Sequence, residues 1–103
     1  IDLSSVLGNV LENAIDGCRT ISPEKRSIQL SVTTRHDAWL YIVSTNTFDG
    51  ITKQKNGYYQ TTRPNGHGIG LASIQITVEK YNGTAQFSND ASCFYVDIMI
   101  PIA

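Results

Sequence analysis

The sequence carries little charge of either sign and has no long apolar run, and both shortages narrow the classes of protein it can belong to. Eight Lys and Arg against nine Asp and Glu give a formal net charge of -1, which disfavours nucleic-acid binding by massed phosphate neutralisation. No apolar stretch approaches the ~20 residues of a membrane-spanning helix, and no basic and apolar leader opens the chain. We therefore expect a soluble domain without a nucleic-acid partner or a membrane contact of its own.

Cysteine is also scarce. Cys18 and Cys93 are the only two, and they lie in separate expected elements without companion ligands at metal-like spacing. Because cytosolic disulfides are rare, we expect two buried free thiols in a reducing compartment. The 103 residues, 41% of them hydrophobic, predict one compact domain over residues 1–103. The chain starts directly in a helical pattern, as a domain excised from a longer protein would.

Hydrophobic periodicity predicts the regular elements. Apolar residues over residues 2–19 recur at steps of three and one, which indicates an amphipathic helix with Asp2 or Ser4 as cap and a last turn weakened by Gly17. Later runs alternate apolar and polar residues, as strands with one buried face do. In chain order we expect a helix over 2–19, strands 27–34 and 38–45 with Ile28, Leu30 and Val32 on the buried face, a helix over 69–81 ended by Asn82-Gly83, and strands 84–90 and 93–101.

The segment from Asp49 to Gly68 breaks this regularity. It is rich in glycine, asparagine and basic residues and poor in aliphatic ones. About twenty residues without regular structure are unusual inside a compact domain and tend to form lids or binding loops. We expect a functional loop here.

Asn9, Asn13 and Asp16 form a polar stripe on the first helix, nearly opposite its apolar seam. Such a stripe is either a solvated face or a ligand site. Asparagine is a mediocre helix former, and an amide carbonyl is an oxygen ligand that suits Mg²⁺.

Gly66, Gly68 and Gly70 precede the second helix at alternate positions. They serve either a tight loop or an anion site, in which backbone N–H groups approach phosphate at a helix N-terminus. Glycine spacing alone is weak evidence, because a dinucleotide fingerprint needs a preceding strand in a βαβ unit and a Walker loop needs Gly-Lys-Ser/Thr. This sequence predicts neither.

Three motifs together are more specific. "LGNVLENAIDGCR", "STNTFDG" and "NGHGIGLASI", in this order, resemble the ATP-binding domain shared by gyrase, histidine kinases and mismatch-repair ATPases, the Bergerat fold of the GHKL superfamily. Within it, the sequence looks most like the catalytic domain of bacterial sensor histidine kinases, particularly the peptide quorum-sensing type. The resemblance spans nearly the whole chain. It implies an α+β fold, a two-layer α/β sandwich whose mixed, mostly antiparallel sheet carries the helices on one face.

The resemblance also implies roles on the first helix. Asn13 matches the asparagine that coordinates the nucleotide's Mg²⁺, and Asn9 stands where hydrolysing members carry a catalytic glutamate. Because an amide cannot accept a proton as a carboxylate does, Asn9 favours a kinase over an efficient ATPase. Glu12 points about 100° away and is a poorer base. Asp16 stands where many sensor kinases have a phosphate-binding lysine, and a carboxylate cannot take that role. We expect Asp16 either to contact Mg²⁺ through a water molecule or to be solvated.

In the second motif, Asn46 stands where the family has the aspartate that receives the adenine amino group, and Phe48 replaces the first glycine. Asn46 still offers a carbonyl acceptor. Asp49 is the alternative adenine ligand, or else a turn-former before Gly50.

In the third motif, the resemblance implies that Gly66, Gly68 and Gly70 let the backbone amides around Ile69, Gly70 and Leu71 reach the phosphates, with residues 51–65 as the ATP lid. Arg63, Lys53 and Lys55 either neutralise phosphate or are solvated. Tyr58 and Tyr59 either cover the adenine or anchor the lid. Neither His67, at a variable motif position within the nucleotide-binding loop, nor His36, in a hairpin turn, is expected to be catalytic.

The implied function is the ATP-binding catalytic domain of a two-component sensor histidine kinase, with ATP and Mg²⁺ as cofactors. It would transfer the γ-phosphoryl group to a histidine on a separate dimerisation domain, absent here, and ultimately serve a response regulator. The expected location is the cytoplasmic portion of a membrane-anchored bacterial sensor, and the isolated domain would bind ATP but autophosphorylate poorly. The alternatives are a related ATPase, an anti-sigma-type serine kinase, or a non-catalytic interaction module.

Overall fold

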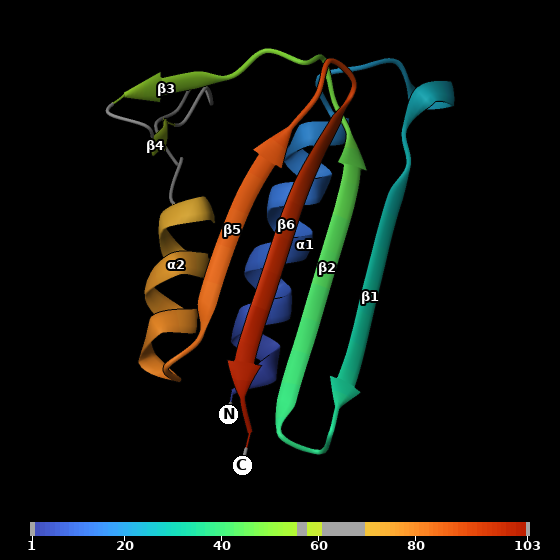
Figure 1. Ribbon diagram of the computed structural model, residues 1–103. Helices are drawn as coiled ribbons and strands as arrows, with labels where there is room; N and C mark the ends of the chain where they lie inside the picture. The colour runs from blue at the N-terminus through green and yellow to red at the C-terminus, as the bar shows by residue number, and fades with distance from the viewer. Residues whose placement is uncertain (1, 56–57, 61–69, 103) are drawn as a thin grey trace.

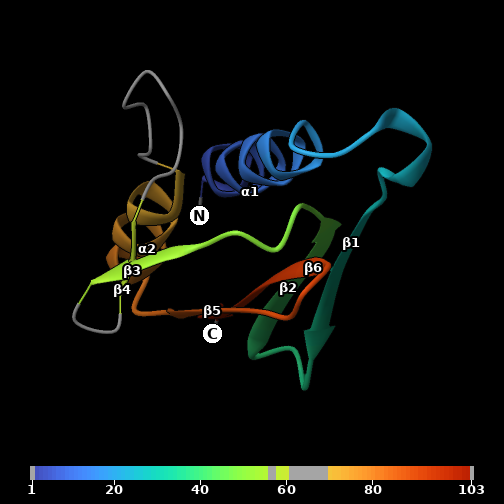
Figure 2. The same ribbon diagram turned by 90° about the horizontal axis from the view of Figure 1, so that it is seen from above.

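The computed structural model describes residues 2–55, 58–60 and 70–102, and within them an antiparallel sheet of strand order β1-β2-β6-β5 forms one layer. Two helices of the described chain form the second layer on one face of this sheet (Figures 1 and 2). The elements are α1 (Leu3–Cys18), the 3-10 turn η1 (Pro23–Lys25), β1 (Ile28–Arg35), β2 (Trp39–Thr47), β3 (Lys53–Lys55), β4 (Tyr58–Gln60), α2 (Gly70–Lys80), β5 (Thr84–Asn89) and β6 (Cys93–Pro101).

The predicted α+β sandwich is confirmed, with two differences. The sheet was expected to be mixed, but every strand pairing in the described chain is antiparallel. The segment from Asp49 to Gly68 was expected to lack regular structure, yet β3 and β4 pair as a short hairpin within it. Strands of three residues are too short for hydrophobic alternation to be recognised in the sequence.

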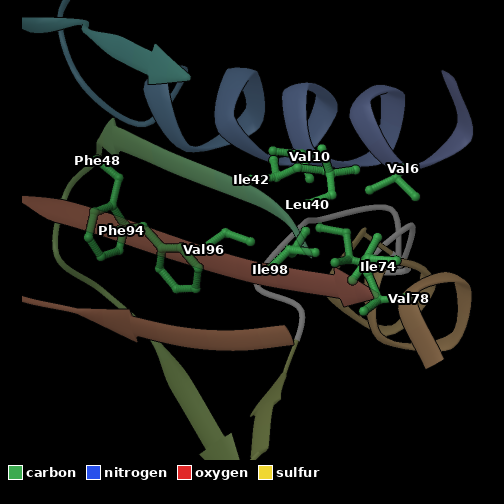
Figure 3. Packing of buried hydrophobic residues seen from close by; sticks show 11 residues of the cluster. Val6, Val10, Leu40, Ile42, Phe48, Ile74, Val78, Phe94, Val96 and Ile98 are labelled. Carbon is green, nitrogen blue, oxygen red and sulfur yellow. The ribbon is translucent and has the colours of Figure 1, made fainter. Parts of the chain in front are cut away.

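The helices and the two central strands enclose the core. Along β2 and β6, alternate side chains point to the helical layer, and they meet the apolar faces of α1 and α2 there (Figure 3). Each such side chain contributes about 1.5–3 kcal/mol on burial. The buried cluster consists of Val6, Val10, Leu40, Ile42, Phe48, Ile74, Val78, Phe94, Val96, Ile98 and Ile100.

The start of α1 and the end of α2 are formed as their sequences predict. The Asp2 carboxylate accepts a hydrogen bond from the Ser5 N–H (3.2 Å) at the start of α1, and the Asp2 N–H donates to the Tyr81 hydroxyl (2.8 Å). After α2, Asn82 has a left-handed φ of 59°, and the Gly83 N–H donates to the Val78 carbonyl (3.0 Å). This is a Schellman end, and the Tyr81 contact ties it to the start of α1.

Strand β1 is at the edge of the sheet, and its predicted burial is wrong. Ile28, Leu30 and Val32 pair with residues on the helical face of β2, but their side chains remain 37%, 37% and 43% exposed. Helix α1 lies over the centre of the sheet and leaves β1 uncovered (Figure 2). Alternation in the sequence therefore identifies the face of this strand and not its burial.

The β5–β6 turn is held by Asp90. Its carboxylate accepts hydrogen bonds from the Tyr95 hydroxyl (2.7 Å) and from the N–H groups of Ser92 (2.9 Å) and Cys93 (2.7 Å). The Tyr95 hydrogen bond first, and then the two N–H groups, lower the pKa of Asp90 to about 2. The same bond raises the pKa of Tyr95 to about 12.

Replacing Gly8 with alanine is expected to stabilise the domain. Gly8 is exposed within α1, and a Cβ built there meets no atom within 4 Å. Glycine inside a helix costs about 0.5–1 kcal/mol relative to alanine, so Gly8→Ala should raise the free energy of unfolding by that amount in urea titrations. Gly83→Ala is the contrasting variant and should destabilise, because its Cβ would lie 2.6 Å from the Met99 carbonyl oxygen. A stability loss in Gly8→Ala would contradict this account.

Replacing Asp90 with asparagine is expected to lower the melting temperature at pH 7. Because the folded pKa of Asp90 is about 2, its stabilisation is complete above the ordinary pKa of about 4 and is lost as the pH falls towards 2. The difference between wild type and Asp90→Asn should therefore shrink between pH 4 and pH 2 in thermal melts. Asp97→Asn, on an exposed position of β6, is the control. A pH-independent difference would show that charge on Asp90 is not the cause.

Candidate functional site

Asn46, near the end of β2, is the most unusual polar residue of the domain. Its side chain is 2% exposed on the strand face that packs against the helices. The amide Nδ2 donates to the Thr47 carbonyl (3.1 Å), whereas Oδ1 accepts no hydrogen bond from the residues that the structure describes. A buried acceptor without a partner is costly, so Oδ1 is a position at which a ligand donor would be favourable.

Gly17 of α1 makes room for this amide. A Cβ on Gly17 would clash with Asn46 Nδ2 and lie 3.4 Å from Cγ. The helix can approach the end of β2 only because position 17 has no side chain. Gly17 was expected merely to weaken the last turn of the helix, and the structure gives it this packing role as well.

Phe48 packs into the core beside Asn46. Its ring meets Phe94 edge to face, with centroids 5.8 Å apart, and its N–H donates to the Ser92 carbonyl (3.0 Å). Figure 3 shows the two rings side by side at the end of the cluster. Phe48, expected to stand where the family has a glycine, is therefore part of the hydrophobic core.

Asp49 and Gly50 form the turn after β2. The exposed Asp49 carboxylate accepts a hydrogen bond from the Ile51 N–H (2.9 Å), and the Asp49 N–H donates to the Thr20 hydroxyl (3.0 Å). Gly50 has a φ of 79°, a conformation that glycine adopts readily. Between the two alternatives for Asp49, this geometry favours the turn-former, and Asn46 has the burial expected of a ligand-reading group.

Asn9 and Asn13 lie beside the apolar seam of α1 and not opposite it as expected, because both are half-buried. Ile15 of the same helix lines a shallow pocket with Arg26 and Ile28 next to β1. Asn13 is about 200° around the helix from Ile15, so it faces away from β1. Helix α2 lies on that side of α1, opposite β1 (Figure 2).

The two acidic neighbours on α1 are placed differently. Glu12 is exposed, in keeping with its expected orientation away from the asparagines. Asp16 is half-buried and pairs with Arg19 at 3.3 Å. Arg19 is 70% exposed, so this pair adds little stability.

Tyr59 anchors the β3–β4 hairpin, the described part of the expected lid. Its ring packs on Phe94 with centroids 5.2 Å apart, and its hydroxyl donates to Asn89 Oδ1 (2.7 Å). Of the two roles considered for Tyr59, the structure favours the anchor. Lys53 is exposed on β3, and for Lys55 and Tyr58 the backbone alone is described, in β3 and β4.

The glycine motif is described only at its end. Gly70 begins α2, and Leu71 packs half-buried against the core cluster. His36 occupies the β1–β2 turn with a φ of 55°, as the hairpin prediction requires. Arg63, Gly66, His67, Gly68 and Ile69 lie outside the described residues.

The cysteines, the possible metal ligands and the helices of the described residues also bear on the site. Cys18 and Cys93 are both free thiols, as predicted, but only Cys18 is buried; Cys93 was also expected to be buried and is half-buried. No three His, Cys, Asp or Glu side chains among the described residues gather as a metal site. None of the described helices combines the length and the apolarity needed to cross a membrane.

Sequence reasoning missed Ser44. This residue is 1% exposed, and its Oγ, like Asn46 Oδ1, has no hydrogen-bond partner among the described residues. The available signal was a polar residue at an inward position of β2, directly after the apolar Leu40 and Ile42 in the alternation.

The family profile of the GHKL domain matches residues 1–101 of the chain, and no curated relative matches. Among solved structures, a mycobacterial sensor histidine kinase, MprB, is 19% identical with a TM-score of 0.64, over 95% of this chain and 73% of that one. The catalytic domain of the histidine kinase ThkA is 20% identical with a TM-score of 0.70, over 96% and 65%. The Acinetobacter baumannii histidine kinase AdeS is 21% identical with a TM-score of 0.68, over 96% and 45%.

At these identities the solved structures establish a shared fold, and the chain spans only part of the length of each. The profile agrees with the sequence motifs and with the two layers of sheet and helices. It also agrees with the fold that this chain shares with histidine kinase catalytic domains. Since that profile covers nearly the whole chain, the protein belongs to the GHKL domain family.

Proposed function

We propose that this domain binds Mg-ATP and serves as the catalytic domain of a two-component sensor histidine kinase. The observation that carries the proposal is that the buried Oδ1 of Asn46 has no hydrogen-bond partner among the described residues, at the position where GHKL relatives read the adenine amino group. Membership of the GHKL family and the fold shared with histidine kinase catalytic domains support it.

The orientation of the Asn46 amide suits adenine. One N–H of Nδ2 donates to the Thr47 carbonyl, and Oδ1, a hydrogen-bond acceptor, has no partner among the described residues. The 6-amino group of adenine is a donor. Its binding would therefore give Oδ1 a partner.

Asn13, a half-buried residue of α1, would hold the cation through its amide oxygen, a ligand of the type that Mg²⁺ accepts. When bound, Mg²⁺ neutralises charge on the phosphate oxygens. Asn9 offers no carboxylate to take a proton from water, which suits a kinase that must protect the phosphoryl group from hydrolysis.

The phosphoryl acceptor would be a histidine on a dimerisation domain outside this chain, with a response regulator downstream and a cytoplasmic position in a membrane-anchored sensor. In this scheme the domain binds and orients the nucleotide, and phosphoryl transfer depends mainly on such positioning. The isolated domain should accordingly bind ATP and autophosphorylate poorly.

Replacing Asn13 with alanine is expected to abolish most of the assistance that Mg²⁺ gives to nucleotide binding. Wild type and Asn13→Ala would be titrated calorimetrically with a non-hydrolysable ATP analogue, with and without Mg²⁺. We expect affinity to fall by more than about tenfold with Mg²⁺ present, the cost of losing a charge-assisted ligand, and to change little without it. Glu12→Ala, exposed on the same helix, is the matched control and should bind as wild type does.

A second function has one observation in its favour, the replacement of a family glycine by Phe48, which packs into the core. A GHKL domain altered in this motif could act as a non-catalytic interaction module. A folded wild-type domain that gives no heat with Mg-ATP would select this module and refute the kinase. If ATP binds, mixing with histidine-bearing or serine-bearing acceptor proteins separates a histidine kinase from a serine kinase, and steady phosphate release without an acceptor identifies an ATPase.

A further inference from the structure

We propose that Ser44 is a second base-reading residue, whose hydroxyl donates a hydrogen bond to ring nitrogen N1 of adenine, directly or through one water. The inference rests on the proposed ATP-binding function and goes beyond it, because the resemblance to the family assigns no role to Ser44, the first residue of the second motif. It would make Ser44 a specificity-determining residue of this chain.

The first support is the state of the Ser44 hydroxyl. Ser44 is 1% exposed, and its Oγ has no hydrogen-bond partner among the described residues. Buried polar groups are normally satisfied by protein or by ordered water. Ser44 Oγ and Asn46 Oδ1 are the two buried side-chain atoms of the described chain that lack such a partner.

The second support is their common location. Ser44 and Asn46 are alternate residues of β2, paired with Val96 and Phe94 of β6, so they share the face that packs against the helices. Neighbours on one face of a strand are about 6.5–7 Å apart at their Cα atoms. Two unsatisfied groups on one face at this spacing can engage neighbouring atoms of one small ring, since the amide side chain is longer than the hydroxyl one.

The third support is chemical complementarity. The edge of adenine presents an amino donor next to N1, which is an acceptor. Asn46 contributes an acceptor, because its Nδ2 is already engaged, and a serine hydroxyl can rotate to donate. A 6-oxo purine presents the reverse order, an acceptor next to an N1–H donor, so the pair discriminates against guanine and hypoxanthine.

The test starts with Ser44→Ala titrated with Mg-ADP by calorimetry. We expect affinity to fall about five- to tenfold, the effect of one lost hydrogen bond. The melting temperature of the nucleotide-free variant should stay equal or rise, because the substitution removes a buried group without a partner. The matched control is Ser31→Ala, an exposed strand serine of β1, which should bind Mg-ADP as wild type does.

A nucleotide analogue supplies the decisive arm. In 1-deaza-ADP a C–H group replaces N1, so wild type should bind it about five- to tenfold more weakly than ADP. Ser44→Ala should bind the two nucleotides equally, because the same hydrogen bond is already gone. The preference of wild type for ADP over inosine diphosphate should also narrow in the variant.

Equal binding of ADP and 1-deaza-ADP by wild type would overturn the proposal. This comparison uses the wild-type protein alone, so it does not depend on whether a variant folds. Unchanged ADP affinity in a folded Ser44→Ala would overturn it as well and would mark Ser44 as a core hydroxyl without a ligand role. Both results leave the proposed function intact. If folded wild type binds neither ADP nor the ATP analogue, the proposed function itself fails, and this inference with it.

Discussion

The close contact between α1 and β2 is the constraint on which the rest of the domain depends. Along most of this contact, apolar residues such as Val10 of the helix and Ile42 of the strand exclude water and hold the two layers together. At its end, the helix presents Gly17 and the strand presents Asn46. The same approach that builds the core thus buries a polar amide, and the apolar part of the contact offsets the cost of an Oδ1 that has no partner in the part of the chain that the structure describes.

How much of the fold follows from sequence depends on how local each signal is. The periodicity that defines α1, the asparagine and glycine that end α2, and the alternation in β2 all act within a few residues, and they predict elements correctly to within two residues. The β3–β4 hairpin depends instead on Tyr59 packing against Phe94, far along the chain. The exposure of Ile28 depends on where α1 crosses the sheet, which no local pattern encodes.

The site residues divide in the same way, into those that a local motif predicts and those whose role depends on packing. Motif order predicted Asn46 and Asn13 as ligand-binding residues and left Asp49 as the second choice for the base. The hydrogen bond from the Ile51 N–H to the Asp49 carboxylate favours a turn-forming role for Asp49. Ser44 was beyond sequence reasoning because what distinguishes it is a buried hydroxyl without a partner among the described residues. Which polar atoms remain unsatisfied is a property of the packed structure alone.

One aromatic residue connects the Asn46 end of the sheet to the β3–β4 hairpin, part of the expected lid. Phe94 meets Phe48 on one side, in the segment after Asn46, and Tyr59 of the hairpin on the other. Edge-to-face pairs of this kind stabilise beyond the area they bury. The hairpin is therefore fixed to the same aromatic residues that lie beside Asn46, and Tyr59 is further held by Asn89. A nucleotide read by Asn46 would thus meet a lid whose base is already anchored, so the entropy of ordering that hairpin is spent in folding and not in binding.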